Sequence, residues 1–206
     1  ILKKMINDGH NFDCASMGEI EKVLEYGALP KNIIYANPVK KIEHILFAKQ
    51  KGVNLMTFDC SEEAIKMKKY NDHAEGVLRI AVEDTDAACP IDKFGAPKPM
   101  FSQILDTCKK IGLRLRGVSF HVGSGGCSFS IYKESVEISK GIFEMAKKKG
   151  MPDLDILDIG GGFSMSAENP ENNFDKIAPK IKNLLKKEFG NHKKLRIIAE
   201  PGRLIC

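Results

Sequence analysis

The sequence contains no tryptophan and only four tyrosines, and aromatic residues make up 7% of its 206 positions. It has no apolar run near the ~20 residues that cross a bilayer, and its first residues do not resemble a signal peptide. Nucleic-acid-binding surfaces combine clustered arginines with aromatic side chains. Here the net charge of +5 comes mainly from lysines spread along helical segments, such as residues 147–149. We therefore expect a soluble protein that binds neither nucleic acid nor membranes.

The cysteines form no C-x-x-C pair, because neighbouring cysteines lie at least 19 positions apart. Such spacing predicts neither a zinc site nor a compact disulfide framework, and we expect no bound metal. Free thiols are typical of the reducing cytosol, so the expected location is cytoplasmic. The cysteines are Cys14, Cys60, Cys89, Cys108, Cys127 and Cys206.

Seven short runs rich in β-branched residues, each bounded by turn residues, predict seven strands, and segments with helical periodicity lie between them. The predicted strands are residues 12–14, 33–36, 55–58, 77–82, 117–122, 154–159 and 196–199. The predicted helices are residues 17–26, 39–51, 62–70, 101–111, 132–149 and 174–189, and residues 2–6 resemble the end of a further helix.

Apolar strands that alternate with amphipathic helices indicate a parallel sheet, since each helix returns the chain to the same end of the sheet. Seven such units are one fewer than in an eight-stranded β/α barrel, which usually has ~250 residues. We predict an α/β fold of the (β/α)8 TIM-barrel type, with its first strand upstream of Ile1. Residues 1–206 would then form one partial barrel domain. Residues 84–99 and 164–173 are predicted surface loops.

The ends of several predicted strands are polar, and reactive groups of β/α barrels lie at the carboxyl ends of their strands. The polar positions are Asp13, Arg79, His121, residues 123–126, Asp158, residues 160–162 and residues 200–203. Glycine-rich turns let backbone N–H groups approach phosphate oxygens, because no Cβ blocks the way. The Ser124 hydroxyl and the Arg203 guanidinium also suit a phosphate. The sequence therefore indicates a phosphate-binding site.

Each of these positions also has a structural interpretation that the spacing alone leaves open. A glycine triplet can be only a tight turn. Glu200 either holds a protonated ring nitrogen or pairs with a nearby Lys or Arg, and His121 either contacts a ligand or is a core residue. Asp13 and Arg79 either serve the site or form a buried ion pair. The other histidines are expected at the surface: His10, His44, His73 and His192.

Seven motifs follow one another in the order and approximate spacing of a known family. They are FDCAS (12–16), IYANP (34–38), VLRIA (77–81), KFG (93–95), FHVGSG (120–125), LDIGGGF (157–163) and AEPGR (199–203). In these motifs the chain resembles the eukaryotic ornithine decarboxylases, and FDCAS favours them over their diaminopimelate and arginine relatives. The resemblance implies a pyridoxal 5'-phosphate enzyme with an alanine-racemase-like barrel, followed by a β-rich C-terminal domain.

The resemblance also assigns roles to matched positions. Glu200 would pair with the pyridine nitrogen, and His121 would stack on the cofactor ring. Asp13, Glu19 and Arg79 would lie around the Schiff base and the phosphate side of the site. The cofactor-binding positions would be Ser124, Gly161, Gly162, Glu200, Pro201, Gly202 and Arg203. One departure is Leu204, where the family usually has an aromatic residue.

Two parts of the family's active site are expected outside this sequence. The Schiff-base lysine is expected upstream of Ile1. No lysine here replaces it, since Lys40 lies in a predicted loop after Pro38, and Lys3 and Lys4 lie on a predicted helix. The C-terminal domain, which supplies a catalytic cysteine and substrate-binding carboxylates across a dimer interface, is expected beyond Cys206. We therefore expect the isolated fragment to be inactive.

The implied activity is the removal of CO2 from L-ornithine to give putrescine, in polyamine biosynthesis, by a homodimer. The alternatives are a non-enzymatic antizyme-inhibitor-like relative that binds antizyme, a decarboxylase for another basic amino acid, and a single-domain carrier of the cofactor. Antizyme is a candidate partner. Antizyme inhibitors tend to lose the equivalents of Asp13 and Arg79, and both are present here, which favours the enzyme.

Overall fold

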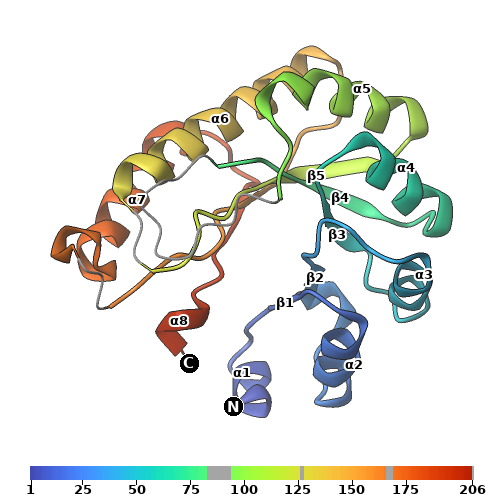
Figure 1. Ribbon diagram of the computed structural model, residues 1–206, viewed down its shortest axis with the longest axis horizontal. Coiled ribbons are helices and arrows are strands. Elements are labelled where there is room, and N and C mark those ends of the chain that lie inside the picture. Colours follow the sequence, from blue (N-terminus) through green and yellow to red (C-terminus); the bar gives the residue numbers. More distant parts are fainter. Residues whose placement is uncertain (83–93, 126–127, 166–168, 206) are drawn as a thin grey trace. The chain divides into compact units, whose positions relative to one another are not determined.

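The computed structural model describes residues 1–82, 94–125, 128–165 and 169–205, with only the backbone of Arg203 and Ile205. The chain divides into two compact units. The first comprises Ile1–Leu78 and Ser102–Leu115, and the second comprises Arg79–Phe101 and Arg116–Cys206. In both, strands alternate with helices along the chain (Figure 1).

The first unit contains parallel strands in the order of the chain. Phe12 pairs with Ile33, Tyr35 pairs with Met56, and Leu55 pairs with Glu75. The strands are β1 (Phe12–Cys14), β2 (Ile33–Tyr35), β3 (Leu55–Phe58) and β4 (Glu75–Arg79). The helices are α1 (Leu2–Asn7), α2 (Met17–Glu25), α3 (Ile42–Gln50), α4 (Ser61–Tyr70) and α5 (Phe101–Ile111), and a 3-10 turn η1 spans Pro30–Asn32.

The second unit has three parallel strands, in which Gly117 pairs with Ile156 and Asp158 pairs with Ile198. The strands are β5 (Arg114–Ser119), β6 (Ile156–Asp158) and β7 (Arg196–Ile198). The helices are α6 (Phe129–Lys148), α7 (Phe174–Phe189) and α8 (Gly202–Ile205), and the 3-10 turns are η2 (Lys98–Met100) and η3 (Pro170–Asn172).

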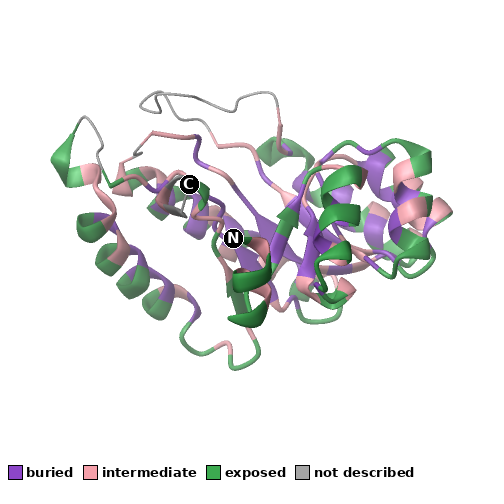
Figure 2. Ribbon diagram, turned by 90° about the horizontal axis from the view of Figure 1, so that it is seen from below, coloured by how far each residue is buried: buried purple, intermediate pink, exposed green. Residues whose placement is uncertain are grey.

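Helix α6 shows why the amphipathic segments pack as they do. Its buried residues recur every three or four positions, which is the period of one helix face. They are Tyr132, Ser135, Val136, Ser139, Ile142 and Ala146. Helix α7 packs against α6, where the rings of Phe143 and Phe189 meet edge to face at 5.2 Å. Figure 2 shows buried residues concentrated in the strands and on one side of the helices.

All seven predicted strands and all six predicted helices occur in the described residues. The bounds of β1, β3, α5 and α7 agree to the residue with the prediction. Strand β4 ends at Arg79 rather than at position 82. Beyond it, Ile80 N–H donates to Ser119 O, and an isolated bridge follows in which Ala81 N–H donates to Ala96 O and Ala96 N–H donates to Arg79 O. The predicted loop 84–99 lies largely outside the described residues, as do residues 166–168 of the second loop.

Within the described ranges, no helix combines the length and the apolar character that crossing a bilayer requires.

An ion pair joins the amino ends of the strands in the second unit. The Arg116 guanidinium donates from Nε to Asp155 Oδ1 at 2.6 Å and from Nη2 to Asp155 Oδ2 at 2.8 Å. The Asp155 N–H donates to Arg116 O and the Asp155 carbonyl accepts from the N–H of Arg196, so β5, the residue before β6 and the first residue of β7 are tied together. Both side chains are about three-quarters buried, at 25% and 29% exposure.

We expect Arg116→Met to lower the free energy of unfolding by about 1–3 kcal/mol, because the largely buried Asp155 carboxylate loses both charge-assisted hydrogen bonds. Urea unfolding followed by circular dichroism measures this change. The control is Lys133→Met, which removes an exposed pair with Glu137 at 3.9 Å and should change the free energy by less than about 1 kcal/mol. Equal effects of the two substitutions would contradict a special contribution of the Arg116–Asp155 ion pair to stability.

Candidate functional site

The carboxyl end of β6 runs into the turn formed by Gly160, Gly161 and Gly162, and this turn is fixed from several sides. The Asp158 carboxylate accepts a hydrogen bond from Gly160 N–H at 2.9 Å. The carbonyl of Gly160 accepts from the N–H of Glu200 at 2.8 Å, so the ends of β6 and β7 are joined. The carbonyl of Gly161 is held as well, by Tyr132.

Tyr132 is a site residue that the sequence analysis treated only as the start of a helix. Its hydroxyl donates to Gly161 O at 2.8 Å, and the side chain is fully buried. Its ring stacks on Phe163 with centroids 5.5 Å apart, and it meets Phe120 edge to face at 6.5 Å. The glycine turn therefore rests on a rigid aromatic cluster. No periodic pattern distinguishes a tyrosine with this function from an ordinary core residue.

Gly161 lies where no side chain fits. A Cβ there would lie 2.8 Å from Glu200 O and 2.9 Å from His121 Nε2. At Gly162, φ is +93° and a Cβ would lie 2.6 Å from Val122 Cγ2, so this position also requires glycine. The structure thus brings three predicted site positions together: His121, Gly161 and Glu200. Among the described residues, the N–H groups of Gly161 and Gly162 have no hydrogen-bond partner.

His121 lies just beyond β5 and is held in its neutral form. Its Nδ1 accepts a hydrogen bond from Gly123 N–H at 3.0 Å, so Nδ1 carries no proton and the proton is on Nε2. Burial, and then the nearby Arg79 charge, lower the pKa of His121 to about 4. The Arg79 guanidinium itself lies over the Phe94 ring, 5.3 Å from its centroid.

The remaining predicted positions of the second unit follow β7 or lie near His121. Glu200 and Pro201 are half-buried, and the Glu200 carbonyl accepts from Gly202 N–H at 2.8 Å at the start of α8. Ser124 is half-buried and precedes a pair of residues, 126–127, that are outside the described range. The side chain of Arg203 is also outside the described part of the chain.

In the first unit, Asp13 and Glu19 lie on β1 and on α2. The Glu19 carboxylate accepts from Ala15 N–H at 2.5 Å and from Ser16 N–H at 3.1 Å, while Ser16 Oγ accepts from Glu19 N–H. This capping box fixes the turn that follows Asp13. Asp13 itself is exposed rather than buried.

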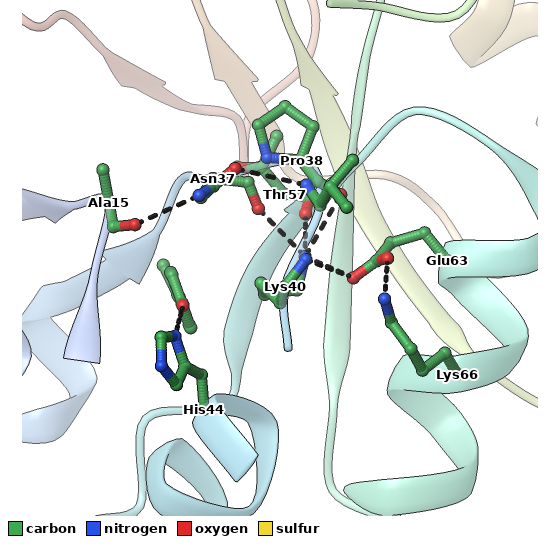
Figure 3. A network of polar contacts seen from close by, with 10 residues as sticks. Ala15, Asn37, Pro38, Lys40, His44, Thr57, Glu63 and Lys66 are labelled. Atoms are coloured by element: carbon green, nitrogen blue, oxygen red, sulfur yellow. Dashed lines mark hydrogen bonds and ion pairs between the residues drawn. The ribbon is translucent and has the colours of Figure 1, made fainter. Parts of the chain in front are cut away.

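Lys40 has a far more enclosed side chain than its loop position predicts (Figure 3). It forms an ion pair with Glu63 at 3.1 Å, and the two side chains are 0% and 3% exposed. The ammonium also donates to three carbonyls, Thr57 O at 2.6 Å, Asn37 O at 3.0 Å and Pro38 O at 3.4 Å. Burial lowers the pKa of Lys40 to about 8, although the Glu63 charge opposes this shift. Its nitrogen is therefore saturated and is not open to a ligand.

Two histidines that were expected at the surface are partly buried instead. His44 Nδ1 lies 3.2 Å from the Tyr35 hydroxyl (Figure 3), and Tyr35 is itself buried, which raises its pKa to about 12. His192 packs edge to face on Phe143 at 5.8 Å, and its buried Nδ1 has no partner in the described part of the chain. In both cases the helix that carries or precedes the histidine turns it toward an aromatic ring. His10 and His73 are exposed, as predicted.

A cavity of about 500 Å³ lies beside α7 and β7 in the second unit. Its walls are mainly apolar, with Ile181, Leu185 and Phe189 on the helix and Ile197 on the strand. Mainly apolar walls do not suit a phosphate, which needs converging hydrogen-bond donors. We therefore place the candidate site at the glycine turn and not in this cavity.

A rigid turn of small residues at the carboxyl ends of parallel strands, with N–H groups available beside a neutral histidine, defines the class of proteins that hold an anionic cofactor on a β/α scaffold. The whole chain, residues 1–206, matches the family described as pyridoxal-dependent decarboxylase, pyridoxal binding domain. The chain belongs to this family, and its cofactor is pyridoxal phosphate.

Curated relatives of known name agree with this family. The chain is 39% identical to ornithine decarboxylase of Schizosaccharomyces pombe over 98% of its length, and 42% identical to that of Caenorhabditis elegans over 100%. It is 40% identical over 98% of its length to antizyme inhibitor 2 of Xenopus laevis. These matches cover 45%, 48% and 44% of the relatives, so the chain spans about half of their length.

Among solved structures, the arginine decarboxylase of Paramecium bursaria Chlorella virus superposes with a TM-score of 0.90 at 37% identity, over 98% of this chain and 54% of that one. The predicted fold class, an α/β barrel of which seven strands lie in this chain, is confirmed by this similarity and by the seven observed strands.

The neutral state of His121 makes a prediction about stability and pH. Its pKa is about 4 in the folded protein and ordinarily 6.5, so between these values only the unfolded chain binds the proton. The contribution to the free energy of unfolding is therefore complete above pH 6.5 and is lost as the pH falls toward 4. Urea unfolding at pH 7 and pH 5 should show a larger loss of stability in the natural protein than in His121→Phe. If the free energy of unfolding depends on pH in the same way in both proteins, this prediction is wrong.

Proposed function

We propose that the protein containing this domain is an ornithine decarboxylase, which converts L-ornithine to putrescine and CO2 in polyamine biosynthesis. The observation that carries the proposal is the close packing of Gly161 against the His121 ring and the Glu200 backbone, because it brings the glycine turn, a neutral flat ring and the residue that carries a carboxylate together. Relatives about 40% identical over nearly the whole chain, named ornithine decarboxylase, support the choice of substrate.

The residues of the second unit fit the bound cofactor. The N–H groups of Gly161 and Gly162, the Ser124 hydroxyl, the Gly202 turn and the Arg203 guanidinium would hold the phosphate dianion. When bound, pyridoxal phosphate supplies an electron-poor ring that accepts the electron pair released as CO2 leaves. His121 would present its ring face to the cofactor without adding charge.

Glu200 would hold a proton on the pyridine nitrogen, since a carboxylate stabilises a pyridinium by a charge-assisted hydrogen bond. Its neighbour Pro201 would fix the direction of the chain between this carboxylate and the phosphate group. Asp13 and Arg79 would serve the reacting end of the site, and Glu19 would hold the turn after Asp13 through its capping box.

Two other functions have a specific observation in their favour. The similarity to antizyme inhibitor 2 of Xenopus laevis supports a non-enzymatic protein that binds antizyme, and the similarity to a viral arginine decarboxylase supports another basic amino acid as substrate. We prefer the enzyme because the chain retains Asp13 and Arg79. Assays with ornithine, lysine and arginine decide between substrates, and absence of activity with all three would favour the inhibitor.

We also propose that the protein is a cytoplasmic homodimer with antizyme as a partner. The free thiols of Cys14, Cys60 and Cys108 support a reducing location, and burial raises the pKa of Cys14 and Cys108 to about 12. Sedimentation of the full-length protein, alone and with antizyme, tests both associations.

If the turn at residues 160–162 binds the phosphate, a single added methyl group should weaken binding strongly. Gly161→Ala should weaken cofactor binding on the order of tenfold or more, because the Cβ displaces the turn and a charge-assisted hydrogen bond is worth ~1.5–3 kcal/mol. Titration of the apoprotein with pyridoxal phosphate measures the affinity. The matched control is Gly141→Ala on the exposed face of α6, where a Cβ meets nothing within 4 Å. It should leave the affinity unchanged and add about 0.5–1 kcal/mol of stability. Unaltered affinity in Gly161→Ala would show that this turn does not bind the cofactor phosphate.

Glu200→Gln separates charge from shape at the ring nitrogen. We expect kcat to fall on the order of 100-fold, because the amide cannot keep the pyridine protonated, while KM for ornithine changes much less. Single-turnover kinetics with saturating cofactor measure the chemical step. A variant within a few-fold of the natural enzyme would mean that Glu200 is only a structural residue at the end of β7.

A further inference from the structure

One ammonium group connects the carboxyl ends of successive strands in the first unit. Lys40 Nζ bonds to Thr57 O on β3, to Asn37 O and Pro38 O in the segment after β2, and to the Glu63 carboxylate on α4 (Figure 3). Four oxygens thus surround three N–H bonds, and the side chain is fully buried. The loop that follows β2 is therefore fastened to the neighbouring strand and helix.

Stability alone does not account for this arrangement. Desolvation of two charges costs several kcal/mol per ion, and a well-packed apolar pair of similar volume is often neutral or stabilising in such a position. Glu63 is held further by Lys66 at 2.6 Å and accepts from Lys40 N–H at 3.2 Å. An apolar pair would not orient the backbone around it. The Lys40 ammonium does, because the three carbonyls that accept from it must all point at the same nitrogen.

The fixed loop is linked in turn to the segment that carries Asp13. The Asn37 amide donates from Nδ2 to Ala15 O at 3.3 Å, and its Oδ1 accepts from Val39 N–H at 3.3 Å. Ala15 is two positions after Asp13, and its own N–H donates to Glu19 at 2.5 Å. A continuous path of hydrogen bonds therefore runs from Lys40 through Asn37 and Ala15 to the capping box of α2.

We propose that Lys40 and Glu63 are positioning residues, which hold the turn after β1, and with it Asp13, in place for the decarboxylation; this rests on the proposed function. Neither residue touches substrate or cofactor. They act through Asn37 and Ala15 at the edge of the strands where β/α barrels carry out their chemistry.

The test replaces both charges at once, since Lys40→Met alone leaves Glu63 buried and unpaired. In the full-length holoenzyme, K40M/E63L should lower kcat/KM for ornithine on the order of 10- to 100-fold, because small displacements of a catalytic group have effects of this size. The midpoint of thermal unfolding and the affinity for pyridoxal phosphate should change little. Hydrogen exchange of the Ala15 and Val39 amides should become faster.

Two controls make the result specific. R116M/D155L removes an ion pair of the same kind from the amino ends of the strands, and its kcat/KM should stay within about threefold of the natural enzyme. E63D keeps the carboxylate charge that faces Lys40 and should retain more of the activity and of the slow exchange of Ala15 than K40M/E63L does.

The outcomes separate the two proposals. A natural protein inactive on ornithine, lysine and arginine overturns the proposed function and this inference with it. An active natural protein with a folded K40M/E63L variant of undiminished kcat/KM overturns this inference alone, whether or not exchange becomes faster. An equal loss of activity in R116M/D155L also overturns it, because the effect would then follow from any lost ion pair.

Discussion

The distances around Gly161 constrain the glycine turn and the residues beside it. A single methyl group on Gly161 would collide with both the Glu200 carbonyl and the His121 ring. The turn can occupy this space only because Asp158, Glu200 and Tyr132 each hold one of its backbone groups. The order of the elements follows from this requirement, since β5, β6 and β7 are parallel neighbours and deliver their carboxyl ends side by side.

The two units fix their functional loops by different physical means. In the second unit, the glycine turn packs closely against its neighbours because it has no side chains, and the aromatic cluster of Tyr132 and Phe163 supports it. This arrangement leaves backbone N–H groups available. In the first unit, a buried ion pair and its carbonyl partners fix the loop after β2, and a capping box fixes the turn after β1. Packing tolerates little change in volume, whereas a buried ion pair tolerates little change in charge. Substitutions in the two units should therefore fail for different reasons.

Much of the fold is predictable because short β-branched runs between turn residues and helical periodicity are local signals. The end of β4 is less predictable, since Ile80 to Val82 are apolar enough for a strand, but the pairing there is an isolated bridge between Ile80 and Ala96 and one hydrogen bond from Ile80 N–H to Ser119 O. The glycine turn and Glu200 could be located from their positions after strands. Lys40, Tyr132 and His44 could not, because a loop lysine, a helix tyrosine and a helix histidine have no pattern that reveals a buried partner distant in sequence.

The hydrogen bond from Gly123 to His121 limits which proton transfers the site can perform. Since Nδ1 is already an acceptor for the backbone, the ring cannot rotate freely or take up a proton there without breaking that bond. The remaining Nε2–H belongs to a neutral imidazole, which is far too weak an acid to give its proton away near neutral pH. His121 can thus serve as a flat surface and as a hydrogen-bond donor. In the proposed decarboxylation, the hydrogen that replaces the departing carboxyl group would then have to come from a different residue.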